Sequence, residues 1–256
     1  TKIHTSAEGL VSYHSLLFIP SHAPYDYYTK TYEKGLQLYS NGVLIMEKCK
    51  ELLPDYFSFV KGIVDSPDLS LNISREILQQ DKSLKTIAKS IETKITKELE
   101  TMMEENREEY EKFFKAFGSQ IKYGIYDQYG INKDKLKDLL IFDTNEHKKV
   151  SLKEYVDNKV EKQDSIYYIC GETVDKIDLL PQVESFKDKG YMILYCTDYM
   201  DEFVLQTLGA YQEMKLVNIS KENIDLSDEE DKKKIEEKNE KEKELLKVME
   251  EDLQIV

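Results

Sequence analysis

The 256-residue sequence has few of the residues that build disulfide frameworks or zinc sites. Its three cysteines, Cys49, Cys170 and Cys196, are far apart and form no CxxC pair. An odd number of dispersed thiols argues against a disulfide framework and favours a reducing cytoplasm. The four histidines are scattered as well, so we expect no metal site.

The sequence also lacks the patterns of a membrane protein and of a self-contained enzyme. No apolar run approaches the length of a membrane span, and no signal peptide is recognisable, so we expect no membrane partner. There is no GxGxxG or GxxxxGKS/T phosphate loop and no serine-nucleophile motif. The paired carboxylates stand in charged surroundings that give no reason for a shifted pKa, so acid–base catalysis is not expected.

Negative charge is the most pronounced feature of what is present. The formal net charge is −14, and charged residues make up 34% of the chain. Nucleic acids and anionic membranes need a basic face that neutralises phosphate, so we expect partners that are proteins and no nucleic acid. Apolar residues make up 40%, with 18 tyrosines and nine phenylalanines, and they can fill a core.

The first 80 residues predict a β-sheet with helical cover. The apolar run Leu16–Ile19 indicates a strand, which Pro20 ends because proline has no N–H to donate. Leu36–Tyr39 and Val43–Met46 flank Asn41-Gly42. That pair favours a two-residue hairpin turn, because both residues tolerate a positive φ.

A helical period follows from residue 84. Apolar residues at three- and four-residue steps predict one long helix with a buried stripe formed by Leu84, Ile87, Ile91, Ile95, Leu99 and Met102. A second helix, predicted to end near Gly118, carries Tyr110, Phe113, Phe114 and Phe117. A third carries Leu136, Leu139 and Leu140. Packing explains these stripes better than a ligand groove does.

Strands and helices alternate in the next region. Ile166–Cys170, Tyr191–Cys196 and Leu216–Ile219 are predicted strands, with helices at Val183–Lys187 and Glu202–Leu208 between them. This order predicts parallel strands joined by right-handed crossovers.

The sequence changes character after residue 227. Residues 228–244 are charged except for Ile235 and Asn239, and an apolar stripe from Leu245 to Leu253 follows. We expect a solvated linker and then the opening helix of a further domain. Because the chain begins with Thr1, we expect it to be a piece of a longer protein.

Residues 64–80 combine turn chemistry with an arginine at a predicted helix start. They read Val-Asp-Ser-Pro-Asp-Leu-Ser-Leu-Asn-Ile-Ser-Arg-Glu-Ile-Leu-Gln-Gln. Asn72 or Ser74 can cap the helix by accepting its first backbone N–H groups. Arg75, one of two arginines among 36 basic residues, could grip a phosphate through a charge-assisted fork. From the residues alone, an exposed ion pair with Glu76 or Glu47 is the other interpretation of Arg75.

The same run resembles the catalytic loop in the middle segment of the heat-shock chaperones of the ninety-kilodalton class. Similar stretches occur in the family's order over roughly residues 8–220, namely 16–20, 23–26, 36–39, 54–62 and 166–173. Ser40-Asn41-Gly42 lacks the basic pair that eukaryotic members tend to carry at this position. The chain therefore resembles the bacterial branch of the family.

The resemblance implies an ATP-driven chaperone whose ATP and Mg are held by a missing N-terminal domain. It implies catalytic roles for Arg75, which would contact the terminal phosphate of ATP, and for Gln79, which would support the loop. Asn72 and Ser74 would shape the loop. Leu44 stands where many members carry phenylalanine in an apolar patch that faces the ATP domain. Unfolded or partly folded client proteins and a homodimeric parent, joined by a missing C-terminal domain, are also implied.

We therefore predict an α/β fold of two α/β/α sandwich subdomains joined by a short helical connector and followed by a charged linker. The expected divisions are 1–104 for the larger sandwich with the catalytic loop, 105–140 for the connector, 141–219 for the smaller sandwich, and 220–256 for the linker and the start of a C-terminal domain. The chain alone is expected to bind no cofactor. Two alternatives stay open, a non-catalytic acidic interaction scaffold and an autonomous α/β enzyme that uses the strand end at Gly171.

Overall fold

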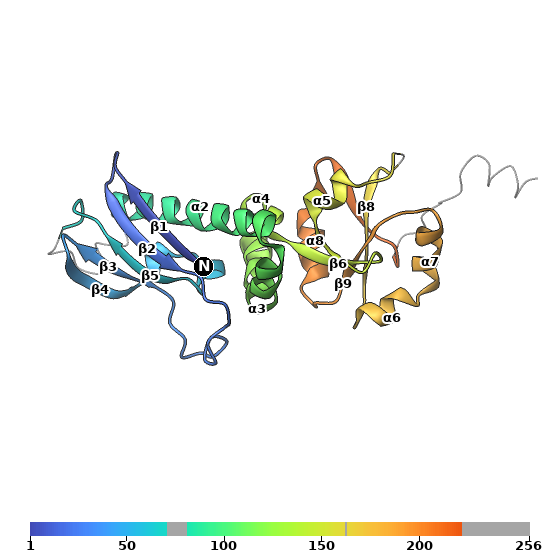
Figure 1. The fold of residues 1–256 in the computed structure, drawn as a ribbon, viewed down its shortest axis with the longest axis horizontal. Helices are drawn as coiled ribbons and strands as arrows, with labels where there is room; N and C mark the ends of the chain where they lie inside the picture. Colours follow the sequence, from blue (N-terminus) through green and yellow to red (C-terminus); the bar gives the residue numbers. More distant parts are fainter. Residues whose placement is uncertain (71–80, 162, 222–256) are drawn as a thin grey trace, which may run out of the picture. The chain divides into compact units, whose positions relative to one another are not determined.

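The structure is a computed structural model that describes residues 1–70, 81–161 and 163–221. Its contacts divide the chain into one unit of Thr1–Asn218 and a second of Ile219–Val256. The first unit contains two β-sheets with helices packed on them (Figure 1), which confirms the predicted α/β class. In the described ranges, no helix has both the length and the apolar composition that crossing a bilayer requires.

The first sheet has five strands in the order β1-β2-β5-β3-β4. All neighbours pair antiparallel except β3 and β5. The predicted hairpin between β3 and β4 turns at Asn41 and Gly42, whose φ angles are 51° and 76°. The strands are β1 (Lys2–Ala7), β2 (Tyr13–Phe18), β3 (Leu36–Ser40), β4 (Val43–Cys49) and β5 (Lys61–Asp65).

Strand β5 lies in the middle of this sheet and leads toward the arginine-bearing segment. Its Gly62 has a φ of 147°, and a Cβ on that residue would lie 2.2 Å from the carbonyl oxygen of Leu16 on β2. Backbone cannot move aside as a flexible side chain can, so this close approach of two strands requires glycine.

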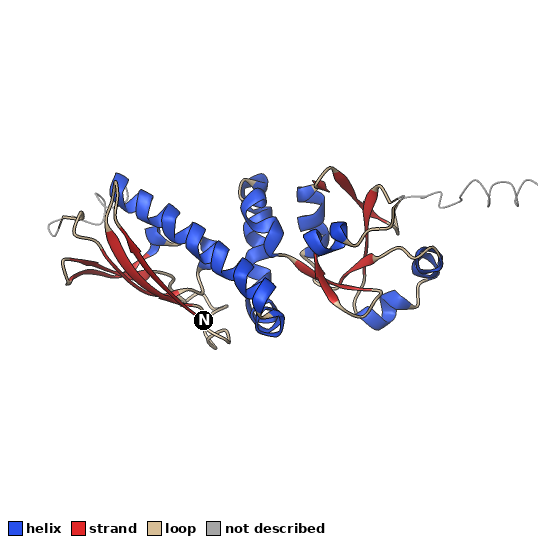
Figure 2. Cartoon of the chain, turned by 45° about the horizontal axis from the view of Figure 1, so that its top comes forward, coloured by secondary structure: helices blue, strands red, loops and turns tan. Residues whose placement is uncertain are grey.

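One long helix lies across the first sheet, and a second long helix follows it and packs against it (Figure 2). Helix α2 (Lys82–Glu105) buries every residue of the predicted stripe. Asn106 ends α2 and caps α3 (Arg107–Tyr126), since its side chain accepts from Glu109 N at 3.3 Å. Two 3₁₀ turns, η1 (Lys50–Leu52) and η2 (Asp55–Phe57), precede β5.

The prediction that the second helix ends near Gly118 is wrong, because α3 continues to Tyr126. Gly118 and Gly124 serve close packing instead. A Cβ on Gly118 would lie 2.9 Å from the ring of Phe114, and one on Gly124 would lie 2.6 Å from the side chain of Tyr56. Glycine inside a helix costs free energy, and here the closer approach of the neighbouring rings offsets that cost.

Short turns stand where the third helix was predicted. They are η3 (Asp127–Gly130), α4 (Lys133–Leu136) and η4 (Lys137–Leu139). Leu136, Leu139 and Leu140 are all fully buried, so the pattern identified core residues although the helix is only one turn long.

The second sheet has six strands in the order β10-β11-β8-β9-β6-β7. Strands β11, β8 and β9 pair parallel, as predicted, and the outer strands pair antiparallel. The strands are β6 (Ile141–Thr144), β7 (Lys149–Ser151), β8 (Ser165–Cys170), β9 (Ile193–Cys196), β10 (Ala210–Tyr211) and β11 (Met214–Asn218).

The helices of the second sheet lie on both of its faces (Figure 1). The crossover from β8 to β9 runs one way along the sheet and that from β9 to β11 runs the other way. Right-handed crossovers therefore place α6 and α7 on one face and α8 on the opposite face. The helices are α5 (Leu152–Asp157), α6 (Val174–Asp178), α7 (Pro181–Asp188) and α8 (Asp201–Leu208).

Candidate functional site

Four of the five predicted site residues, Asn72, Ser74, Arg75 and Gln79, lie outside the described residues. The structure does describe both flanks of their segment and the fifth residue, Leu44. The flanks show how the fold holds the two ends from which the arginine-bearing segment extends.

The N-terminal flank is tied to the sheet by hydrogen bonds from fully buried serines. Ser66 Oγ donates to the carbonyl oxygen of Ser12 at 2.7 Å, and Ser12 N donates to Asp68 Oδ2 at 2.6 Å. Ser40 Oγ donates to the carbonyl oxygen of Leu69 at 2.6 Å. A buried hydroxyl must find such a partner, so these serines fix the path of residues 66–69.

The C-terminal flank is fixed by the start of α2. The Asp81 carboxylate accepts from Leu84 N at 2.9 Å, which satisfies an otherwise unpaired N–H of the first turn. Leu84 itself is buried in the core. One turn and a half further on, Ser90 Oγ lies 2.7 Å from Tyr13 Oη on β2. The residues before segment 71–80 are thus held by the first sheet, and those after it are held by the start of α2.

Leu44 lies on β4, which is the last strand in the described order of the first sheet. Its side chain is 43% exposed, and that of its neighbour Val43 is 53% exposed. Gly42 N donates to Asp65 Oδ2 at 3.0 Å, which ties the hairpin to the strand leading into residues 66–70. Leu44 is therefore an apolar side chain open to contact with another surface.

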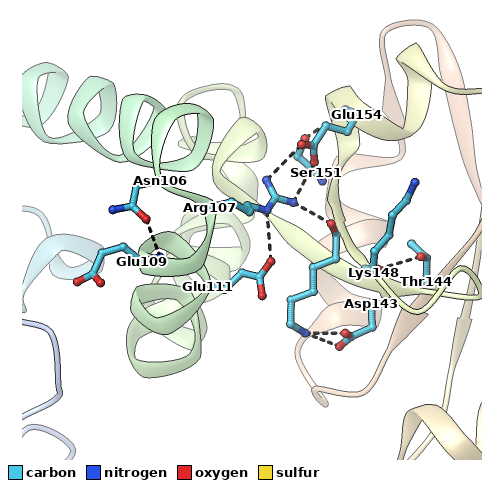
Figure 3. A network of polar contacts seen from close by, with 10 residues as sticks. Asn106, Arg107, Glu109, Glu111, Asp143, Thr144, Lys148, Ser151 and Glu154 are labelled. Carbon is cyan, nitrogen blue, oxygen red and sulfur yellow. Dashed lines mark hydrogen bonds and ion pairs between the residues drawn. The ribbon is translucent and has the colours of Figure 1, made fainter.

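Arg107, the second arginine of the chain, joins the start of α3 to β7 and α5 (Figure 3). Its guanidinium forks onto Glu154, with Nη1 3.3 Å from Oε1 and Nη2 3.0 Å from Oε2. Nη2 also donates to the carbonyl oxygen of Lys149 at 2.9 Å, and Nε lies 3.5 Å from Glu111 Oε1. Lysine could not make this set of contacts, because it lacks the planar fork.

Glu154 is the acceptor on which this network converges. Burial alone would raise the pKa of its carboxyl group. The hydrogen bond from Ser151 N, 2.6 Å long, and the charge of Arg107 outweigh burial and lower that pKa. Ser151 also caps α5 by accepting from Glu154 N at 3.2 Å, which completes a capping box.

Replacing Arg107 tests this network. We expect Arg107→Ala to lower the free energy of unfolding by about 1–2 kcal/mol, because four contacts are lost from a charged group that water partly screens. Arg107→Lys should recover less than half of the loss. Urea unfolding measures both. Lys148→Ala, which removes an exposed pair with Glu146, is the matched control and should change stability by less than about 0.5 kcal/mol. Equal effects of Arg107→Ala and Lys148→Ala would contradict this account.

A cleft of about 660 Å³ opens beside a second ionic cluster on α3 and α8. The Lys122 side chain is 8% exposed, and its Nζ lies 2.6 Å from Asp201 Oδ1 and 3.1 Å from Asp198 Oδ2. Burial disfavours the charged ammonium, but the two carboxylates outweigh it and raise the pKa of Lys122. The lysine is therefore held protonated between two acids.

The same carboxylates organise the turn into α8. Asp198 Oδ1 accepts from Met200 N at 3.0 Å, and Asp201 Oδ2 accepts from Asp198 N at 3.0 Å. Burial works to raise the pKa of Asp198, yet the hydrogen bond from Met200 N and the charge of Lys122 lower it. The two ion pairs of Lys122 thus hold α3 against the turn into α8 and its first residue, Asp201.

The ionic clusters of Arg107 and Lys122 were not found from the sequence. For Lys122 a signal existed, since it stands one turn after Gly118 and one position after Ile121 on the buried face of α3. A lysine on an apolar face needs a carboxylate partner, although the sequence of the helix does not identify that carboxylate. In the part of the chain that the structure describes, no three His, Cys, Asp or Glu side chains gather as metal ligands.

The described residues define an α/β protein with two sheets and helices packed on them. The family model described as Hsp90 protein matches residues 1–255. The chain therefore belongs to the Hsp90 protein family, which confirms the resemblance seen in the sequence.

Its relatives include proteins named chaperone protein HtpG. The one from Clostridium perfringens (strain ATCC 13124) is 58% identical over 93% of this chain and 38% of its own length. The relative from Bacillus subtilis (strain 168) is 53% identical over 97% of this chain and 40% of its own length. The relative from Clostridium acetobutylicum is 56% identical over 98% of this chain and 40% of its own length. The chain thus spans about two fifths of the length of these relatives.

Proposed function

We propose that the chain is the middle segment of an ATP-dependent molecular chaperone. In this proposal an N-terminal domain outside the chain holds ATP and Mg, and Arg75 reaches the terminal phosphate. The parent is a cytoplasmic homodimer that is joined through a C-terminal domain. Membership of the Hsp90 family and the chaperone names of relatives that extend well beyond the matched part support this proposal.

The observation that carries the role of Arg75 is the anchoring of both ends of its segment. Buried hydrogen bonds hold residues 66–69, and the Asp81 cap holds the start of α2. Anchored ends restrict the space that the arginine can search, which lowers the entropy lost when it meets a phosphate. Arg75 would then stabilise charge that develops on the transferred phosphoryl group, as arginine fingers do.

The remaining predicted residues take supporting roles in this proposal. Gln79 supports the loop that carries Arg75, and Asn72 and Ser74 shape that loop. Leu44, exposed on β4, contacts the ATP-holding domain. Client proteins contact apolar side chains on the surface, where Tyr25 and Tyr129 are fully exposed.

We also propose the four-part division of the chain at residues 104/105, 140/141 and 219/220. The joint at Asn106, which ends α2 and caps α3, supports the first of these boundaries. The start of β6 at Ile141 supports the second.

Calorimetry with ATP and Mg tests whether ATP is held by the N-terminal domain and not by this chain. The isolated chain should bind ATP no more tightly than about 1 mM, because one guanidinium supplies few contacts against the entropy of association. The full-length protein should bind it more tightly, and only the full-length protein should hydrolyse it. A micromolar affinity of the isolated chain would overturn the proposal and favour an autonomous nucleotide-binding enzyme.

A further inference from the structure

Two of the three cysteines lie side by side at the ends of neighbouring strands. Cys170 is the last residue of β8 and Cys196 the last residue of β9. The two strands run parallel, and Cys170 and Cys196 are direct partners in their register. Gly171 N donates to the carbonyl oxygen of Cys196 at 3.0 Å, so the pairing continues past the two thiols.

The geometry of the sheet brings the two thiols to one face. Direct partners in parallel strands point their side chains the same way, and neighbouring strands lie about 4.8 Å apart. That spacing falls within the Cα–Cα range of about 4.4–6.8 Å that disulfides span. Cys196 is 2% exposed and belongs to the core, whereas Cys170 is partly exposed and packs against that core. One thiol is thus open to a small oxidant, and its neighbour is shielded.

The surroundings of Cys196 favour its protonated thiol. Burial, a hydrogen bond with Cys170 and the charge of Asp201 together raise the pKa of the Cys196 thiol well above its usual value. A protonated thiol is a poor nucleophile, so Cys196 should not react with an oxidant by itself. A sulfenic acid on the adjacent Cys170 is a far better target for Cys196 than any group in solvent, because the two sulfurs are already in contact.

We propose that Cys170 and Cys196 form a reversible disulfide when the protein meets a peroxide. The Cys170 thiolate attacks one oxygen of hydrogen peroxide, which breaks the O–O bond and gives a sulfenic acid and, after protonation, water. The Cys196 sulfur then attacks Cys170 Sγ, so that the S–S bond forms as the S–O bond breaks, and the thiol proton of Cys196 passes to the departing oxygen, which leaves as water. Two thiols and one peroxide thus become one disulfide and two waters, and a dithiol reductant reverses the change.

The disulfide would join the end of β8, which leads into α6, to the end of β9, which leads into α8. It closes a loop that contains α6, α7 and β9, and it lies next to Asp201 of the Lys122 cluster. Closing a loop removes freedom from the unfolded chain, so the oxidised protein should melt several degrees higher than the reduced protein if the sheet is not distorted.

The experiment treats the full-length protein with hydrogen peroxide and maps its peptides after alkylation. We expect a cross-linked pair of tryptic peptides, 163–176 joined to 190–215, that a dithiol reductant releases. Cys170→Ser and Cys196→Ser should each abolish it. Cys49→Ser is the matched control, since Cys49 is buried with its thiol 3.5 Å from Glu51, and it should form the cross-link at the wild-type rate.

Three results would overturn the proposal. One is accumulation of sulfinic acid on Cys170 without the cross-link, and a second is the absence of oxidation at both positions. The third is a cross-link that forms equally well in urea, because the folded strands would then not be what brings the thiols together. A folded Cys196→Ser variant that stops at sulfenic acid on Cys170 would support the order of steps.

Discussion

Arg75→Ala in the full-length protein should lower kcat for ATP hydrolysis by about 10³-fold, at the lower end of the effect of arginine fingers. The affinity for ATP should change by no more than a few-fold. A group that acts on charge developing in the transition state contributes to kcat and little to the binding of the ground state. Steady-state hydrolysis and calorimetry measure the two quantities separately.

Two further variants sharpen this prediction. Arg75→Lys should restore little activity, because an ammonium keeps the charge but loses the planar fork. Lys85→Ala removes one positive charge from the exposed first turn of α2, close to the same segment, and should hydrolyse ATP at the wild-type rate. Equal losses in Lys85→Ala and Arg75→Ala would show a general effect of charge and would contradict a specific role of Arg75.

Lys122→Met should lower the free energy of unfolding by about 3–5 kcal/mol at neutral pH, the usual cost of removing one partner of a buried ion pair. The substitution leaves Asp201, which is 3% exposed, without its counter-ion. Chemical denaturation of the isolated chain measures the effect. Lys112→Met removes an exposed lysine from the same helix and should stay within about 0.5 kcal/mol.

The loss in Lys122→Met should depend on pH in a defined direction. Burial already raises the pKa of Asp201 above its usual value against the opposing charge of Lys122, and without that lysine the pKa rises further. A carboxyl group whose folded pKa is raised is most favourable below its unfolded pKa of about 4 and loses stability as the pH rises through the folded value. The defect should therefore shrink on acidification from neutral pH. Lys122→Met/Asp201→Asn should be more stable at neutral pH than Lys122→Met, and a defect independent of pH would contradict the buried-pair account.

Local features of the fold could be predicted because they depend on neighbouring residues. The Asn41-Gly42 turn follows from two residues that tolerate positive φ, and the buried stripe of α2 follows from its spacing. Strand β1 was missed because its sequence does not alternate between large apolar and polar residues. Only Ile3 supplies a large apolar side chain, and Thr5 is buried through pairing with β2. Strand β5 was missed because Lys61, Gly62 and Asp65 leave only two apolar residues in its run of five.

The ion pairs that could not be predicted from the sequence join residues that are far apart in the chain. Arg107 meets Glu154 47 residues further along the chain, and Lys122 meets Asp198 76 residues away. No periodicity selects those partners among 50 acidic residues. The contact of Gly118 with Phe114 is local. The sequence alone, however, does not distinguish a glycine that packs against a ring from a glycine that ends a helix. The family, by contrast, was recognisable from runs such as 64–80, and Arg75, Gln79, Asn72, Ser74 and Leu44 took their predicted roles from it.

Single-turnover hydrolysis of prebound ATP by full-length Arg75→Ala tests the central claim most directly, because it isolates the chemical step from binding and product release. We expect the step to be slowed as much as kcat, about 10³-fold, with ATP bound to saturation. A chemical step at the wild-type rate in a variant that still binds ATP would contradict the role of Arg75 at the terminal phosphate.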